Sequence, residues 1–178
     1  MKEVNTPNPR HTFFEFDVKE CVSEVAWARE TAYKKAMHTK DTWQRRGACK
    51  RFTNLFHGDL AKNIFRRFIV FNRPDVAESL SEYDRVRDDG FRNNDVYDLM
   101  LICKGRQCSI EVKSSCEKYT NSIDEIYANR RLIINVDSVH SHRSCAYVQV
   151  MYVPANLNYF GGFKSEVQRR YDESVAAS

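Results

Sequence analysis

Hydrophobic positions in the first part of the chain recur at helical spacing. Residues 20–50 contain few helix-breaking residues and predict a helix, which the Arg45-Arg46-Gly47 sequence interrupts. A second helix is predicted to begin near Gly58-Asp59 and to end before Pro74, because proline cannot continue a helix. Its apolar stripe consists of Leu60, Ile64, Phe65 and Phe68. Residues 1–18 are expected to form an arm that ends in a short extended stretch.

The second part of the chain alternates polar connections with strand-like segments. Residues 81–95 are dense in charged side chains and predict a connection. Residues 96–103 and 108–114 predict the two strands of a β-hairpin. A helix over 123–132, a strand over 146–153 and a terminal helix over 165–174 are expected to follow.

One α/β domain over 1–178 accounts for these elements. We expect a mixed β-sheet flanked by helices, with a helical N-terminal part. The predicted parts are listed in chain order: an arm over 1–18, a mainly helical part over 20–72, the hairpin over 95–115, and closing helices and a strand over 116–178.

Composition adds few constraints. The chain is 42% hydrophobic and 29% charged, an ordinary globular balance, and its net charge of +4 permits a polyanionic partner. No apolar segment is long enough to span a bilayer, and the polar, proline-bearing start is unlike a secretory signal, so an intracellular (cytoplasmic) protein without a membrane partner is expected. The six cysteines lack tight CxxC pairs, which favours reduced thiols over a zinc site, with an iron–sulfur cluster as the minor alternative.

The hairpin gathers charged side chains on one of its faces. With Gly105 and Arg106 as a two-residue turn, Asp98 is predicted to face Lys113. Side chains alternate along a strand, so one face collects the apolar residues and the other the polar ones. The predicted core face holds Leu99, Leu101, Ile110 and Val112, and the predicted polar face holds Asp98, Met100, Ser109, Glu111, Lys113 and Ser115.

This polar face predicts phosphodiester chemistry. Two neighbouring carboxylates, Asp98 and Glu111, repel each other unless a divalent cation lies between them, and oxygen ligands of this kind suit Mg²⁺ or Mn²⁺. The ammonium group of Lys113 would orient or help to deprotonate the attacking water. The simpler alternative is a surface hairpin with a cross-strand Asp98–Lys113 ion pair.

The same residues resemble a known motif. Asp98-Leu99-Met100-Leu101-Ile102, followed after a turn by Ile110-Glu111-Val112-Lys113, is similar to the signature of the PD-(D/E)xK nuclease superfamily. The resemblance implies a restriction-endonuclease-like fold. It also implies a metal held by Asp98, Glu111 and the carbonyl of Val112, with Lys113 as the catalytic lysine. Tyr97 stands where the motif's proline is expected.

The resemblance also implies an acidic residue on a preceding helix. Asp59 after Gly58 matches that position, and its alternative is an ordinary first-turn acid favoured by the helix dipole. Glu78 and Glu82 are weaker candidates for this role. Asp95 is a rival of Asp98, but the alternation places it off the Glu111 face.

Basic and hydroxyl side chains supply candidate DNA contacts. The predicted contacts are Arg45, Arg46, Lys62, Arg66, Ser114 and Ser115. A solvated helix face is the alternative for the basic residues, and a strand end is the alternative for the serines. His140 and His142 read as part of a polar loop rather than as a metal pair.

The sequence therefore predicts a Mg²⁺-dependent DNA endonuclease, with a restriction or phage-defence role as one hypothesis. Catalysis would rest on Asp98, Glu111, Lys113 and Asp59. A homodimer would bring two active sites to a duplex. The alternatives are a junction or repair nuclease, and a non-catalytic nucleic-acid-binding or assembly subunit with the same fold.

Overall fold

The computed structural model describes residues 2–4, 13–38, 47–116, 125, 146–152 and 169. Within these residues the chain forms two long helices, a four-stranded sheet and a small two-stranded sheet. The helical elements are η1 (Val18–Glu20), α1 (Val22–His38), α2 (Ala48–Asn72), η2 (Pro74–Ser79) and α3 (Tyr83–Val86). The strands are β1 (Lys2–Val4), β2 (Phe13–Glu15), β3 (Ser81–Glu82), β4 (Leu99–Cys103), β5 (Arg106–Cys116) and β6 (Ala146–Tyr152).

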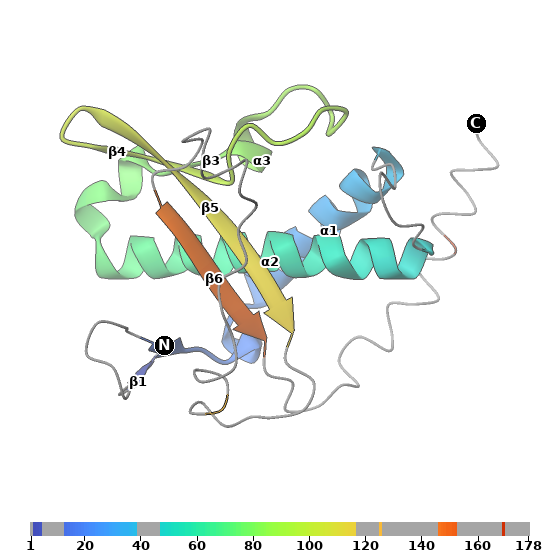
Figure 1. Cartoon of the computed structure of the whole chain (residues 1–178), viewed down its shortest axis with the longest axis horizontal. Coiled ribbons are helices and arrows are strands. Elements are labelled where there is room, and N and C mark those ends of the chain that lie inside the picture. The colour runs from blue at the N-terminus through green and yellow to red at the C-terminus, as the bar shows by residue number, and fades with distance from the viewer. Residues whose placement is uncertain are drawn as a thin grey trace.

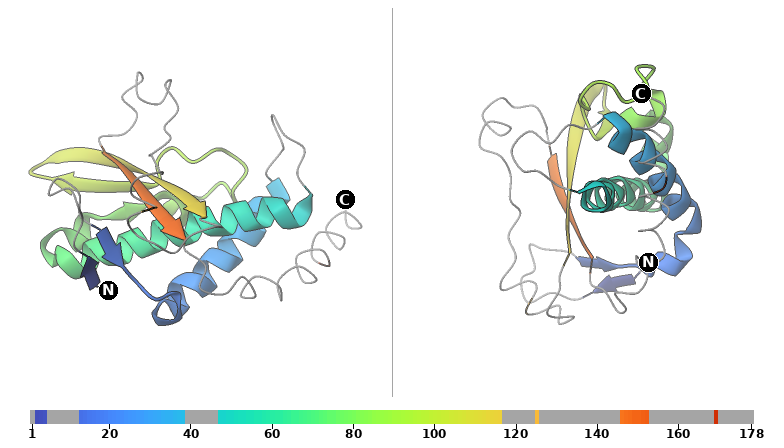
Figure 2. Two further views of the ribbon diagram at one scale, coloured as in Figure 1. Left: turned by 60° about the horizontal axis from the view of Figure 1, so that its bottom comes forward. Right: turned by 90° about the vertical axis from the view of Figure 1, so that its right-hand side faces the viewer.

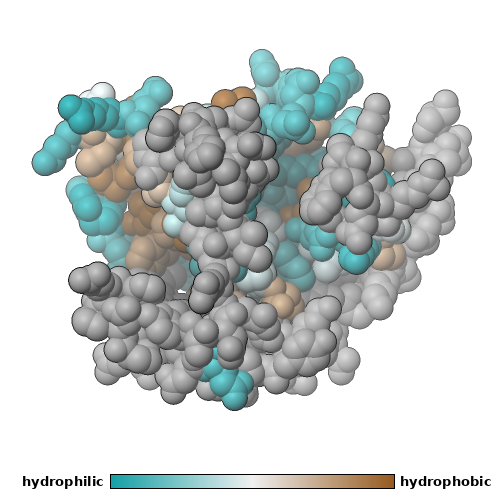
Figure 3. Space-filling model, in the orientation of Figure 1, coloured by the Kyte–Doolittle hydropathy of each residue, from teal (hydrophilic) through white to brown (hydrophobic). Residues whose placement is uncertain are grey.

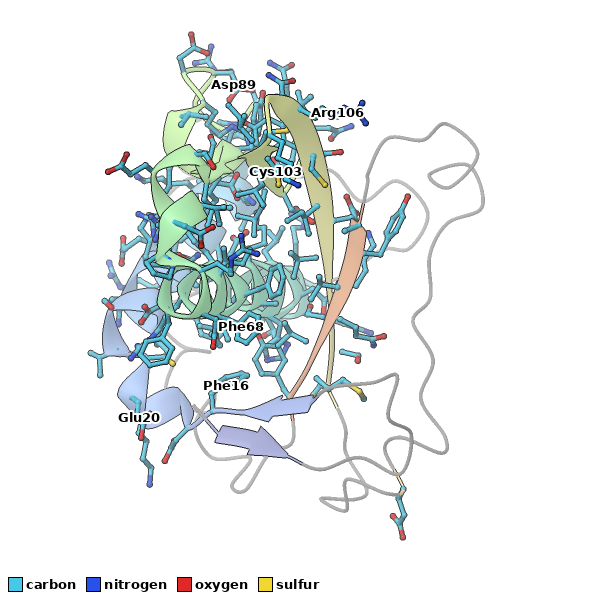
Figure 4. All side chains as sticks on the ribbon, turned by 90° about the vertical axis from the view of Figure 1, so that its left-hand side faces the viewer. Phe16, Glu20, Phe68, Asp89, Cys103 and Arg106 are labelled. Atoms are coloured by element: carbon cyan, nitrogen blue, oxygen red, sulfur yellow. The ribbon has the colours of Figure 1, made fainter. Side chains whose placement is uncertain are left out.

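The long helices and the main sheet stack in layers. Helix α2 packs against β5 on one side and against α1 on the other, so it forms the middle layer (Figures 1 and 2). The buried apolar side chains of the three long strands, Leu99, Ile110, Val112, Val150 and Tyr152, meet those of α2 in a common core. Figure 4 shows side chains filling the space between α2 and the sheet, with Cys103 and Arg106 at the turn end of the hairpin.

The main sheet is mixed, with the strand order β3-β4-β5-β6. Strands β3, β4 and β5 are antiparallel neighbours, whereas β6 runs parallel to β5. The coarse expectation of an α/β fold with a mixed sheet and helices is therefore confirmed. No helix in the described part of the chain is long and apolar enough to cross a membrane.

The hairpin turn differs from the prediction by one residue. Lys104 and Gly105 form the turn, with φ of 50° and 75°, and Cys103 pairs with Arg106. A turn with positive φ at both central residues favours glycine at the second of them, which places Gly105 second rather than first. Each predicted cross-strand partner therefore moves by two residues, and Leu99 pairs with Ile110 instead of Val112. Because this shift is even, every side chain stays on its predicted face.

The helix boundaries need larger corrections. Helix α2 begins at Ala48 with Gly47 as its N-cap, so the predicted interruption at Gly47 is confirmed but the predicted start near Gly58 is wrong. Asp59 therefore lies in the middle of a helix rather than in its first turn. The predicted helices over 123–132 and 165–174 lie outside the described residues except for Glu125 and Arg169, which are helical.

The middle layer buries polar residues as well as apolar ones. Asp59 and Lys62 are 2% and 4% exposed, because α1 and the segment after β3 cover the side of α2 that faces away from β5. Lys62 pairs with Asp84 and, at 3.0 Å, with Asp59. Lys35 on α1 reaches Asp59 at 2.7 Å and Asp84 at 2.6 Å. We call this set the buried charge cluster: Lys35, Asp59, Lys62, Asp84 and, at its exposed edge, Asp95, which lies 3.2 Å from Lys35.

Arg87 organises the connection between α3 and β4. Its guanidinium donates hydrogen bonds to Asp89 at 2.7 and 3.0 Å, to Asp95 at 2.6 Å and to the Asn93 carbonyl at 2.6 Å. The same group lies over the rings of Tyr83 and Phe91. One buried side chain therefore fixes the chain that leads into β4. Hydrophilic residues cover this connection at the upper right of Figure 3.

Replacing Lys62 by methionine should destabilise the fold strongly. Burial opposes the charged form of Lys62, but Asp59 and Asp84 outweigh it and raise its pKa well above the usual range. Removing this ammonium leaves Asp59 and Asp84 to share the ammonium of Lys35, and this incomplete neutralisation of buried carboxylates costs about 3–5 kcal/mol of unfolding free energy. Urea unfolding of Lys62→Met measures the loss.

Arg73→Met provides the matched control, because Arg73 pairs with Asp75 at 2.6 Å on the exposed surface. Arg73→Met should lower the free energy of unfolding by less than about 1 kcal/mol. Equal losses for the two variants would show that the buried charge cluster contributes no more than a surface pair.

Candidate active site

The candidate active site lies where β4 begins beside the middle of β5. Asp98 immediately precedes β4, and its Oδ2 accepts a hydrogen bond of 2.7 Å from the backbone N–H of Val112. Its own carbonyl accepts a bond of 3.3 Å from the N–H of Tyr83. The carboxylate is therefore held against β5 at a point where β4 no longer pairs with that strand.

Glu111 and Lys113 flank Val112 along β5. Val112 is buried in the core, so alternation directs its two neighbours to the opposite face of the sheet. The Lys113 ammonium donates to the Glu111 carboxylate, and these side chains are 42% and 28% exposed. They therefore remain accessible to a substrate. The predicted Asp98–Lys113 ion pair is replaced by this pair along one strand.

The charge of Asp98 is sensitive to its surroundings. Burial raises the pKa of Asp98 to about 6, although Lys62 and the Val112 N–H act in the opposite direction. The nearby carboxylates of Glu111 and Asp95 raise it further. A bound cation between Asp98 and Glu111 would relieve this repulsion.

Lys62 approaches Asp98 from the helix side of the sheet. Its Nζ lies 3.9 Å from Oδ1 of Asp98 and also contacts Asp95 at 3.5 Å. Asp98 is thus the link between the accessible Glu111–Lys113 pair and the buried charge cluster. Asp95, which the sequence places off the Glu111 face, belongs to that cluster.

Asp59 lies within the buried charge cluster, apart from Glu111 and Lys113. Its Oδ1 binds Lys35, while its Oδ2 is buried without a hydrogen-bond partner among the described residues. Burial raises the pKa of Asp59, and Lys62 and Lys35 only partly offset this effect. Lys62 connects Asp59 to Asp98, because its Nζ lies 3.0 Å from Asp59 and 3.9 Å from Asp98. Glu82 is buried and bonded to Arg85, at 2.7 Å.

The residues predicted to contact DNA differ in burial and in location. Lys62 is not on a solvated face, because it is buried and ion-paired, so its prediction as a surface contact is wrong. Arg66 is half-buried on α2. Ser115 shares the face of Glu111 and Lys113, whereas alternation directs Ser114 toward the core side. Arg45, Arg46, His140 and His142 lie outside the described residues.

Cys103 and Cys108 of the hairpin are thiols outside any disulfide, and they do not face each other. Cys103 is exposed and pairs with Arg106, and Cys108 pairs with Leu101. The predicted register, with Gly105 and Arg106 as the turn, would also place Cys103 opposite Cys108, and this pairing does not occur. The one-residue displacement of the turn changes the partners of both cysteines, but it leaves their faces unchanged because the register shift is even.

The donor atoms at this site fit a hard divalent cation. In the described part of the chain, no three or more His, Cys, Asp or Glu side chains form a metal-binding group. The available protein ligands are the carboxylates of Asp98 and Glu111, together with the Val112 carbonyl. The N–H and C=O groups of one strand residue point to the same strand edge, so this carbonyl faces the side that Asp98 occupies. Mg²⁺ commonly binds through few protein oxygens and keeps several waters.

Sequence reasoning did not identify Lys35, Asp84 and Arg87 as determinants of the site. Their only signal was the density of acidic and basic residues in the predicted connection over 81–95. Lys35 appeared as one of many basic residues on a predicted helix, with nothing to indicate burial. Their partners lie far away in the sequence, so pairing became visible only in the fold.

Comparisons with known proteins add no family assignment. No protein-family model, curated protein or solved structure matches the chain.

Asp98→Asn should stabilise the metal-free protein at neutral pH. The folded protein keeps a proton on Asp98 that the unfolded chain loses above its ordinary pKa of 3.8. The free energy of unfolding therefore falls as the pH rises from about 4 to 6, and it stays at this lower value above pH 6. Asparagine does not ionise, and its side-chain oxygen can still accept the hydrogen bond from the Val112 N–H. The free energy of unfolding of the variant should therefore exceed that of wild type by roughly 2–3 kcal/mol at pH 7.5.

Urea unfolding across pH 4–8 measures this difference. Asp89→Asn is the control of opposite sign, because hydrogen bonds from Arg87 hold the pKa of Asp89 below its usual range. That variant should lose stability at neutral pH. An Asp98→Asn variant no more stable than wild type at pH 7.5 would contradict the electrostatic description of Asp98.

Proposed function

We propose that the chain is a metal-dependent nuclease that hydrolyses DNA phosphodiester bonds. The observation that carries the proposal is the 2.7 Å hydrogen bond from Val112 to Asp98. It fixes one carboxylate beside the strand that bears Glu111 and Lys113. Asp98 and the Glu111–Lys113 pair therefore lie on adjacent parts of the sheet, close enough for the Glu111 carboxylate to raise the pKa of Asp98.

The architecture supports a nuclease of the restriction-endonuclease-like class. Asp98 immediately precedes β4, and Glu111 and Lys113 lie on its antiparallel neighbour β5 in a mixed sheet with helices packed against it. Three apolar residues of the motif lie in the core, with Leu99 fully buried and Ile110 and Val112 nearly so. We therefore infer membership of the PD-(D/E)xK superfamily.

Each residue of the patch has a distinct role in this proposal. Asp98, Glu111 and the Val112 carbonyl would hold Mg²⁺ or Mn²⁺, which, when bound, supplies charge stabilisation at the phosphate and a more acidic water. Glu111 keeps the Lys113 ammonium at the patch. Lys113 orients the attacking water and stabilises negative charge that develops on the phosphate.

The partner in this proposal is duplex DNA inside the cell. The net charge of +4 permits a polyanion, and the exposed Lys113 offers a phosphate contact at the patch itself. A second copy of the chain would provide the second active site needed to cut both strands. A restriction or phage-defence role fits such an enzyme.

Cleavage assays on plasmid and branched DNA with Mg²⁺ test the proposal. Asp98→Ala, Glu111→Ala and Lys113→Ala should each lower the cleavage rate by about 10²–10⁴-fold, because each removes a charge that acts at the reacting phosphate. Asp75→Ala is the matched control, since Asp75 is an exposed acid that pairs with Arg73. Its cleavage rate should equal that of wild type.

Two outcomes would overturn the proposal in different ways. Wild-type cleavage with undiminished activity in all three patch variants would place the active site elsewhere. DNA binding without cleavage under Mg²⁺ or Mn²⁺ would favour the non-catalytic nucleic-acid-binding alternative.

A further inference from the structure

Strand β6 carries a polar side chain beside the candidate active site. Gln149 lies in the middle of a strand whose other residues are mostly apolar, Ala146–Tyr152. In the parallel ladder Gln149 is the partner of Lys113, and Tyr147 is the partner of Glu111 (Figure 1). Neighbouring strands lie about 4.8 Å apart, so Gln149 is an immediate lateral neighbour of Lys113.

The orientation of Gln149 follows from burial and from one hydrogen bond. Val150 and Tyr152 are buried on the core side, so alternation directs Gln149 to the face that carries Lys113. Its Nε2 donates a bond of 2.7 Å to the hydroxyl of Ser115, which belongs to the same face. The side chain is therefore fixed on the face of the proposed active site.

The amide of Gln149 retains capacity for a ligand. A glutamine amide has two N–H donors and one acceptor oxygen. Within the described part of the chain, Ser115 is the only residue hydrogen-bonded to the Gln149 side chain. One N–H and Oε1 of the amide thus remain available. This N–H and the exposed ammonium of Lys113 are neighbouring donors, and such a pair suits a phosphate oxygen.

We propose that Gln149 is a substrate-binding residue, whose free amide N–H donates to a non-bridging phosphate oxygen of the nucleic acid bound at Lys113. This inference rests on the proposed function and extends the site from the hairpin to β6. Ser115 is a positioning residue, because its hydroxyl accepts one N–H of the Gln149 amide and leaves the second N–H for the phosphate.

The test measures DNA affinity without cleavage. A labelled DNA duplex is titrated with the Glu111→Gln protein, alone and with Gln149→Ala added, over a series of NaCl concentrations. Gln149→Ala should raise Kd about tenfold, because a hydrogen bond to a charged phosphate is lost. The slope of log Kd against log salt should stay unchanged, because the lost contact carries no charge.

Three further variants make the result specific. Gln107→Ala removes the same residue type from the same face of the sheet, near the hairpin turn, and should leave Kd unchanged. Gln149→Glu should weaken binding more than alanine, because a carboxylate repels phosphate. Ser115→Ala should weaken binding by a smaller factor, and it tests the contact even where Gln149→Ala perturbs the fold.

Failure of this inference is distinguishable from failure of the proposed function. If wild type cleaves DNA while Gln149→Ala and Ser115→Ala match Gln107→Ala in Kd, the inference is overturned and the nuclease stands. If the Glu111→Gln protein binds no duplex at any salt concentration and wild type cleaves none, the proposed function falls and the inference falls with it.

Discussion

The ion pairs between Lys35, Lys62 and three aspartates are the interaction on which the remaining structure depends. Lys62 belongs to the middle helix, Lys35 to the helix that covers it, and Asp84 and Asp95 to the segment before β4. Buried charges of this kind contribute little net stability compared with apolar packing, but they tolerate few alternative arrangements. Their consequence is geometric, because they fix where the chain enters β4 and hence where Asp98 lies.

The candidate site combines this buried constraint with an accessible surface. Asp98 is in contact with both, since one carboxylate oxygen lies near Lys62 and the other binds the N–H of Val112. Glu111 and Lys113 lie on the solvent-accessible face of the same strand. A site of this form separates the rigid part, which holds a ligand atom in place, from the part that meets the substrate.

The sequence was sufficient for the hairpin because its chemistry is local. Alternation alone assigned Glu111 and Lys113 to one face and Val112 to the core, and an even error in register left those assignments intact. It was insufficient for Lys62 and Asp59, which helical spacing places among solvated charges. Their burial depends on partners from α1 and from the segment after β3, and no local pattern reports such contacts. Gln149 was missed for a related reason, since only the parallel pairing of β6 with β5 brings it beside Lys113.

A crystal of the protein soaked in Mn²⁺ tests the central claim most directly, because anomalous scattering locates the metal independently of activity. We predict an anomalous peak between the carboxylates of Asp98 and Glu111 and beside the carbonyl of Val112, and its absence in crystals of Asp98→Asn. A peak at another group of side chains, with Asp98 and Glu111 free of metal, would contradict the assignment of this site.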